Sequence, residues 1–207
     1  MFPLFAIDIG NTNLHIGLFI HDEQISIETL PGEDQAKIKA ALSAAWDQCP
    51  VASSSAQGKR DAVIVVCSVH PERTEQFRQL VRNALDERIY LVGEDIDVPI
   101  AAWVDAPAEV GTDRLVLAAA AYAVAEDAVV VADFGTAVTI DMVDAQGVFQ
   151  GGVILPGFDL AAQSLKDHTA KLPKISVSRP SAPLGKNTRD AINCGLYYGA
   201  IGALQEI

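Results

Sequence analysis

The sequence has 207 residues, of which 50% are hydrophobic and 20% are charged, so it is long enough to bury one large core or two smaller ones. Its formal net charge of −12, with only 15 Lys and Arg residues, argues against a surface for nucleic acid or an anionic membrane, because such surfaces need clustered positive charge. A nucleotide is not excluded, since backbone amides, a helix N-terminus or a metal ion can oppose phosphate charge locally.

The cysteines and the apolar stretches indicate the compartment. The cysteines are odd in number and far apart in the chain, which predicts buried thiols rather than disulfides or a zinc site; they are Cys49, Cys67 and Cys194. The apolar stretch 1–9 has no basic flank, unlike a signal peptide, and the apolar run 115–132 is interrupted by two acidic residues, unlike a membrane span. We therefore expect a cytoplasmic protein.

The first part of the chain alternates short β-branched runs with helical patterns. The run 62–68 is continuously apolar, which is typical of a buried parallel strand. Polar turns at 10–13 and at His21 and Asp22 separate the first three strands, and a Ser-rich loop is expected over 51–59. This order predicts a β-hairpin, a third strand and a β-α-β unit. The strands are predicted at 5–9, 14–19, 23–29, 62–68 and 88–92, and the helices at 35–46 and 72–85.

The second part begins with an Ala- and Leu-rich helix predicted over 111–126. A buried strand over 128–132 follows and ends in Asp133, after which come another apolar strand, an acidic turn at 144–147 and a third strand. The last predicted helix, near 191–206, has apolar residues on most of its faces, which indicates that it packs against another segment or a second subunit.

The two parts form a weak internal repeat. In each, an apolar strand delivers an Asp, then a Gly and a Thr, at Asp8 to Thr12 and again at Asp133 to Thr136, and 125 residues separate the two Asp residues. The repeat predicts two similar lobes, 1–116 and 117–207, which face each other across a cleft and bind a polyphosphate from both sides.

The turn from Gly10 to Asn13 is the first candidate for phosphate contact. It offers backbone N–H groups, a Thr hydroxyl and Asn amides beside Asp8, a set suited to phosphate with an associated cation. Taken alone it is also explained as a plain β-turn, since Asn and Gly favour turns for conformational reasons. The second copy of the motif favours phosphate binding.

Residues 111–114 form a second candidate, just before a long predicted helix. Helix N-terminal amides favour an anion, and Gly111 permits close approach of a ligand. The alternative is that Thr112 or Asp113 only caps the helix. Arg114 is not favoured electrostatically at a helix N-terminus and is better explained by a carboxylate or phosphate partner.

The order of six motifs resembles that of type III pantothenate kinases, members of the superfamily of acetate and sugar kinases, heat-shock chaperones and actin. The resemblance implies an α/β fold of two ribonuclease-H-like lobes with mixed β-sheets flanked by helices, and a homodimer with active sites near its interface. It also implies ATP-dependent phosphorylation of the primary hydroxyl of pantothenate, the first step towards coenzyme A, with Mg²⁺ and a monovalent cation, K⁺ or NH₄⁺. The motifs are residues 8–13, 109–114, 133–137, 151–157, 169–173 and 185–188.

The resemblance also implies roles for single residues. The nucleotide phosphates would contact Asp8, Ile9, Gly10, Asn11, Thr12, Asn13, Leu14, His15 and Thr136. Asp133 matches the ligand of the monovalent cation. Pantothenate would be bound by Gly111, Thr112, Asp113, Arg114 and Thr188, with Asp113 accepting the proton of the hydroxyl. Phosphoryl transfer depends chiefly on positioning and charge neutralisation, so such a set of groups would suffice.

Two features depart from the family pattern. Val104 stands where the family usually has an aromatic residue, so we expect an altered pantothenate pocket or compensation by the neighbouring Trp103. Family members usually continue beyond the position of Ile207 with a Gly-rich segment that contacts the nucleotide, and the resemblance does not extend to that segment.

Two alternative functions remain open at this point. One is a non-catalytic accessory factor that acts through protein contacts. The other is a kinase of another small hydroxy acid or an exopolyphosphatase-like hydrolase, because the phosphate turns alone do not specify the acceptor. The presence of residues 111–114 and Thr188 favours pantothenate over both.

Overall fold

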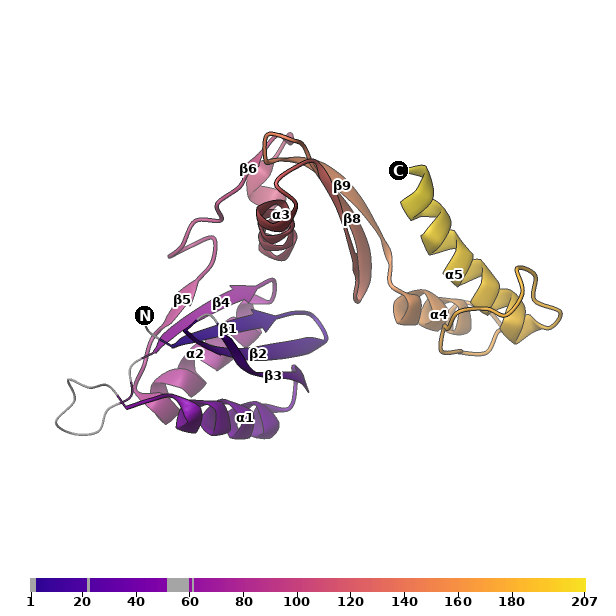
Figure 1. Ribbon diagram of the computed structural model, residues 1–207. Coiled ribbons are helices and arrows are strands. Elements are labelled where there is room, and N and C mark those ends of the chain that lie inside the picture. Colours follow the sequence, from indigo (N-terminus) through magenta and orange to yellow (C-terminus); the bar gives the residue numbers. More distant parts are fainter. Residues whose placement is uncertain (1–2, 22, 52–59, 61) are drawn as a thin grey trace. The chain divides into compact units, whose positions relative to one another are not determined.

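The computed structural model describes residues 3–21, 23–51, 60 and 62–207 (Figure 1). Asp22 of the second predicted turn and residues 52–59 of the predicted Ser-rich loop lie outside the described part of the chain. The chain divides into two compact units: unit 1 comprises Met1–Pro99 and Val110–Val116, and unit 2 comprises Ile100–Glu109 and Leu117–Ile207.

Unit 1 is built on a five-stranded mixed sheet with the strand order β3-β2-β1-β4-β5. The hairpin strands pair antiparallel, and β4 pairs parallel with β5, as predicted for a hairpin and a β-α-β unit. In addition, β1 pairs parallel with β4, which joins the two parts into one sheet. Strand β1 therefore lies at the centre of the sheet, paired on both sides. The strands are β1 (Leu4–Ile9), β2 (Asn13–Ile20), β3 (Glu23–Pro31), β4 (Val63–Ser68) and β5 (Ile89–Leu91).

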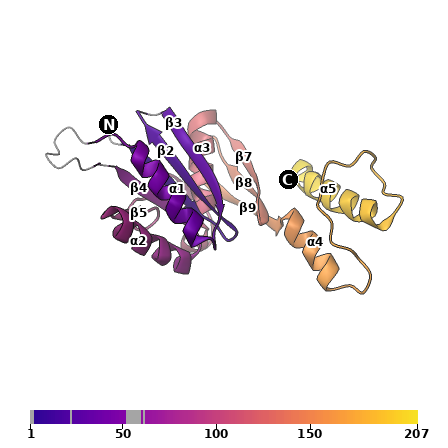
Figure 2. The same cartoon turned by 90° about the horizontal axis from the view of Figure 1, so that it is seen from below.

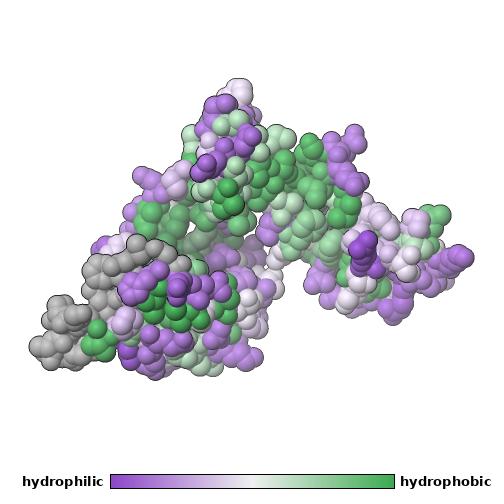
Figure 3. All heavy atoms as spheres, viewed as in Figure 1, coloured by the Kyte–Doolittle hydropathy of each residue, from purple (hydrophilic) through white to green (hydrophobic). Residues whose placement is uncertain are grey.

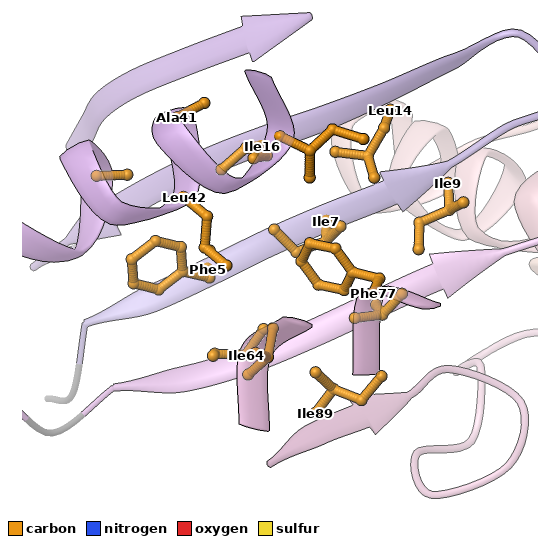
Figure 4. Close-up of a cluster of buried hydrophobic side chains, with 14 of the residues drawn as sticks. Phe5, Ile7, Ile9, Leu14, Ile16, Ala41, Leu42, Ile64, Phe77 and Ile89 are labelled. Atoms are coloured by element: carbon orange, nitrogen blue, oxygen red, sulfur yellow. The ribbon is translucent and has the colours of Figure 1, made fainter. Parts of the chain in front are cut away.

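Two helices, α1 (Gln35–Gln48) and α2 (Pro71–Leu85), cover one face of this sheet (Figures 1 and 2). Side chains alternate along β1, so that Phe5 is fully buried on the helix side while Asp8 is exposed on the other. Figure 4 shows Phe5 beside Leu42 of α1, with Phe77 of α2 in the same cluster. The core thus holds β1 rigidly up to the turn that follows it.

Unit 2 contains a four-stranded mixed sheet with the order β6-β9-β8-β7. Residues 100–109, assigned to the first lobe in the sequence analysis, belong to this unit, where β6 pairs parallel with β9. The strands are β6 (Ala101–Ala102), β7 (Val129–Phe134), β8 (Ala137–Val143) and β9 (Val148–Pro156).

Strand β7 differs from its prediction as a buried strand. It forms the edge of its sheet and pairs with β8, and no other partner of β7 is found among the described residues. On the faces of this strand, Val130 is 48% exposed and Phe134 is 44% exposed. A run of β-branched residues predicts a strand, but it does not reveal which neighbours will cover it.

The remaining helices are a 3₁₀ turn at Pro107–Glu109, α3 (Thr112–Ala125), α4 (Phe158–Asp167) and α5 (Thr188–Glu206). Helices α4 and α5 share a small core in which Ala162 packs with Ile192. Hydrophobic surface remains over the β8–β9 strands and α3 in the view of Figure 3. None of the described helices combines the length and the apolar character that a membrane span requires.

Candidate functional site

The turn after β1 presents polar groups to solvent. Gly10 N donates a hydrogen bond to Asn13 O at 3.0 Å, which closes the turn. The side chains of Asn11 and Thr12 are exposed, as is Asp8 at the end of β1. An exposed carboxylate beside a turn of amides and a hydroxyl has the groups that bind phosphate together with a cation.

Three of the predicted nucleotide contacts are limited by their surroundings. The side chains of Ile9 and Leu14 are 0% and 2% exposed and belong to the core of unit 1, so they offer a ligand only their backbone. The Nδ1 atom of His15 lies 2.9 Å from Thr29 Oγ1, and this hydrogen bond holds the imidazole against β3. The side chains of residues 8–15 that can contact a nucleotide are therefore those of Asp8 and of the turn itself.

Two residues that the sequence analysis missed brace this turn from behind. Arg73 Nη1, from α2, donates hydrogen bonds to Gly10 O at 3.0 Å and to Asn11 O at 2.7 Å. Gly32 N, just after β3, donates to Thr12 O at 2.9 Å. Three consecutive carbonyls of the turn thus accept hydrogen bonds from other segments of unit 1.

The start of α3 places a second carboxylate in unit 1. Asp113 Oδ1 accepts a hydrogen bond from Arg114 N at 2.8 Å, which fixes the carboxylate above Gly111. A Cβ at Gly111 would lie 2.5 Å from the same oxygen, so glycine is needed there. Asp113 lies within α3 (Thr112–Ala125), and its bond to the next residue along the chain is not an N-cap, so the capping alternative stays a prediction.

The thiol of Cys67 is affected by the charges of both Asp8 and Asp113. Cys67 stands beside Asp8 in the parallel β1–β4 register and is half-buried. Burial, with the charges of Asp8 and Asp113 as smaller causes, raises the pKa of the Cys67 thiol to about 12. The charges of the carboxylate beside the phosphate turn and of the carboxylate of α3 therefore act on the same thiol.

A cavity of about 330 Å³ lies beside the second of these groups. Thr112 lines it, together with residues that follow β4 and β5 and the first turns of α2. Its size is at the lower end of the range for small-molecule sites. Ser68, Val69, Glu75, Arg78 and Gly93 are among its other lining residues.

The second copy of the motif, in unit 2, forms a tighter turn. Gly135 N donates to Ala137 O at 3.0 Å, and Gly157 N donates to Thr136 O at 2.9 Å. A Cβ at Gly157 would overlap the carbonyl oxygens of Gly135 and Thr136. Asp133 is exposed at the end of β7, in the position that Asp8 holds on β1.

The glycines that bond the two motif turns, Gly32 and Gly157, belong to the internal repeat. Leu30-Pro31-Gly32 ends β3, and Leu155-Pro156-Gly157 ends β9, with the same offset of 125 residues that relates Asp8 to Asp133. In both units the glycine N–H binds the carbonyl of the motif threonine. This second Leu-Pro-Gly was a signal that sequence comparison of the two halves could have found, whereas nothing in the sequence pointed to Arg73.

The remaining predicted residues lie in other parts of unit 2. Thr188 begins α5 after the N-cap Asn187, and it lines an apolar cavity of about 590 Å³ with side chains of α4 and α5. Val104 lies against Gly151, and the neighbouring Trp103 has a side chain that is 78% exposed. Trp103 is therefore exposed, and both alternatives for Val104, an altered pocket or compensation by Trp103, stay predictions.

The site also has candidate ligands for a metal ion, and the chain has free thiols. In the described ranges, no three His, Cys, Asp or Glu side chains gather as a metal-binding group. Mg²⁺ in nucleotide enzymes is commonly held by one or two carboxylates together with the substrate phosphates, and the exposed Asp8 has the chemistry for that. All three cysteines are free.

Comparisons with known proteins agree with one another. The family described as type III pantothenate kinase matches residues 4–207. A protein from Dehalococcoides mccartyi with the name type III pantothenate kinase is 32% identical over 210 residues, which cover 99% of this chain and 78% of the relative.

Two solved structures share the fold. A Campylobacter jejuni protein assigned to a Baf family of transcriptional activators has a TM-score of 0.59 and 21% identity, covering 98% of this chain and 78% of its own. A Sinorhizobium meliloti protein assigned as a 2-dehydro-3-deoxygalactonokinase has a TM-score of 0.51 and 12% identity, with 98% and 82% covered. At these identities the two structures confirm the predicted α/β architecture of two mixed sheets with flanking helices.

Proposed function

Since this chain belongs to the type III pantothenate kinase family, we propose that it transfers the terminal phosphate of ATP to the primary hydroxyl of pantothenate, the first step towards coenzyme A. The observation that supports the proposal is that unit 1 holds both the amide-rich turn after β1 and the carboxylate of Asp113 at the start of α3. One binds phosphate and the other activates an alcohol, and a kinase needs both.

Both motif turns act on the nucleotide. The amides and side chains of Gly10 to Asn13 bind phosphate oxygens, as does Thr136 in unit 2. Asp8 takes part through the Mg²⁺ ion that accompanies ATP in this family. Ile9, Leu14 and His15 contribute backbone contacts, since their side chains are buried or bound to β3.

Asp113 acts as the general base. Its carboxylate accepts the proton of the pantothenate hydroxyl as the oxygen forms a bond to the terminal phosphorus and the bond from phosphorus to the bridging oxygen of ADP breaks. Gly111, Thr112 and Arg114 bind the same substrate at the start of α3, with Arg114 facing its carboxylate. Thr188 supplies a further contact from the first turn of α5.

Cations neutralise charge during the transfer. A divalent ion bound with ATP offsets the negative charge of the phosphates. We assign Asp133 as a ligand of a monovalent cation, K⁺ or NH₄⁺, because it is an exposed carboxylate next to the second motif turn.

The active form is proposed to be a cytoplasmic homodimer that binds neither nucleic acid nor membranes. The net charge of −12 disfavours polyanionic partners, and free cysteines suit a reducing compartment. Light scattering during size-exclusion chromatography measures the mass, and twice the 22.0 kDa of one chain is expected.

The experiment that tests the function is ADP release by the purified protein with ATP and Mg²⁺, with and without pantothenate. Release that depends on pantothenate, and on K⁺ or NH₄⁺ rather than Na⁺, is expected. Release with another hydroxy acid but not with pantothenate would move the assignment to a different acceptor. A folded protein that binds ATP and releases no ADP with any acceptor would contradict the kinase proposal.

A further inference from the structure

Arg73 reaches the phosphate turn from the first part of α2. Its Nη1 bonds the carbonyls of Gly10 and Asn11, residues that precede it by 63 and 62 positions. The Arg73 side chain is 13% exposed, and its Nη2 lies 3.5 Å from Glu33 Oε1, on a side chain that is 89% exposed. The charge of Arg73 thus lies against the turn, and its ion pair with the exposed Glu33 is weak because solvent screens it.

The contact with Arg73 fixes the direction of the N–H groups of Asn11 and Thr12, because each belongs to the same peptide as a carbonyl that Arg73 binds. In a trans peptide, the C=O of one residue and the N–H of the next point in opposite directions. Because the carbonyls of Gly10 and Asn11 point at Arg73, the N–H groups of Asn11 and Thr12 point away from it. The two peptide dipoles are therefore aligned with their positive ends directed away from the guanidinium, the arrangement that binds an anion.

Hydrogen bonds also hold the start of α2, the helix segment that carries Arg73. Thr74 is buried, and its Oγ1 donates to Ser68 Oγ at 2.7 Å, while Ser68 Oγ donates to Ile9 O at 3.4 Å. Arg73 N also bonds the ring of His70 at 3.4 Å. The start of α2 is therefore fixed to the end of β1, next to the turn that Arg73 contacts.

We propose that Arg73 is a positioning residue for ATP: it holds the amides of residues 11 and 12 in the orientation that binds phosphate, and its charge adds to their field. Gly32 supports this role, since a Cβ there would lie 2.6 Å from Arg73 Nη1 and 3.3 Å from Thr12 O. Glycine at position 32 leaves the space that the guanidinium occupies. The inference rests on the proposed phosphate-binding function of the turn.

The test compares Arg73→Gln, Arg73→Lys and Gly32→Ala with the unchanged protein. Arg73→Gln is expected to raise the KM for ATP about tenfold, because a charge-assisted hydrogen bond at the turn is lost, and to change the KM for pantothenate less than about twofold. Arg73→Lys keeps the charge and is expected to recover part of the loss. Arg82→Gln, an exposed position in the last turn of the same helix, is the matched control and is expected to behave like the unchanged protein.

Gly32→Ala keeps every charge and displaces the guanidinium, so it tests the inference even if Arg73→Gln does not fold. It is expected to raise the KM for ATP in the same direction, and to add nothing in combination with Arg73→Gln. Calorimetric titration of Mg²⁺-ATP measures the affinity directly.

The outcomes separate this inference from the function on which it rests. If the unchanged protein phosphorylates pantothenate and Arg73→Gln has the same KM and affinity for ATP, the inference is wrong and the function stands. Equal rises in both KM values, with a lower melting temperature, would mean that Arg73 is only structural and would also overturn it. If the unchanged protein binds no ATP, both proposals fall.

Discussion

The hairpin β1–β2 of unit 1 and the hairpin β7–β8 of unit 2 carry the same Asp, Gly and Thr, but they are supported differently. Strand β1 is paired on both sides and its turn is braced by Gly32 and Arg73, whereas β7 lies at a sheet edge and its turn is braced by Gly157. The position 125 residues after Arg73 is Tyr198, so the cation was not repeated. The same motif can therefore keep its backbone contact while its electrostatics and its packing diverge.

The largest expected effect separates the chemical roles of the two units. Asp113→Asn should lower kcat by about 10²- to 10⁴-fold and leave the affinity for ATP nearly unchanged, since a base is lost and the phosphate turns are intact. Asp133→Asn, the same type of substitution in unit 2, should instead weaken activation by K⁺ or NH₄⁺. Steady-state kinetics and calorimetric titration measure both, and full activity of Asp113→Asn would exclude it as the base.

The next prediction contrasts the central strand with the edge strand. Phe5 and Val130 occupy corresponding positions in the repeat, but Phe5 is 0% exposed and Val130 is 48% exposed. Phe5→Ala should lower the free energy of unfolding by about 3–5 kcal/mol because it leaves a cavity in the core. Val130→Ala should change it by less than about 0.5 kcal/mol. Urea unfolding measures both, and equal losses would show that β7 is covered as well as β1.

A smaller effect on stability is expected from substitutions of Gly157 and Gly32, the glycines that bond the two motif turns. Gly157→Ala should lower the free energy of unfolding by about 1–3 kcal/mol, because the new Cβ overlaps backbone oxygens that cannot move aside. At Gly32 the closest atom is the tip of a flexible Arg side chain, so Gly32→Ala should cost less stability. Thermal unfolding of the two variants checks the order, and the reverse order would mean that the turn of unit 2 yields more easily than its contacts indicate.

The smallest effect on activity and stability is expected for Cys67, which lies beside Asp8 in the β1–β4 register. With its pKa raised from 9.0 to about 12, the thiol should react with iodoacetamide at pH 8 roughly 10³-fold more slowly than an ordinary thiol, since the thiolate is the nucleophile. The rate should keep rising with pH beyond pH 9. Asp8→Asn should increase it slightly, and mass spectrometry of the labelled peptide measures this. A fast reaction at pH 8 would contradict the buried, acidic surroundings.

Local patterns predicted most of the elements, because β-branched runs and helix formers specify strands and helices over short distances. The hairpin and the β-α-β unit of unit 1 were predicted, but the pairing of β1 with β4, which joins them into one sheet, was not. The exposure of β7 was not predictable, since burial depends on neighbours that the pattern of one strand does not contain. Among the site residues, Ile9 and Leu14 were chosen with their motif, and only the packing showed that their side chains face the core.

The role of Arg73 illustrates a further limit of sequence analysis. It lies on a helix with a polar outer face, where an Arg is ordinary, and its partners are main-chain oxygens whose identity no pattern encodes. The repeated Leu-Pro-Gly was visible in the sequence, but its meaning depended on seeing each glycine bond a threonine carbonyl.

The parallel pairing of β1 with β4 has a consequence for the order of folding. Strands β1, β2 and β3, like β7, β8 and β9, are joined by short turns and can pair as soon as they are synthesised. The link from Ser68 to Ile9 spans 59 residues, so α2 can dock only after a long segment has been made. The first motif turn therefore forms early as a hairpin loop, and Arg73 of α2 binds to it later. Nucleotide affinity should consequently appear in a refolding chain only after the hairpin signal has been recovered.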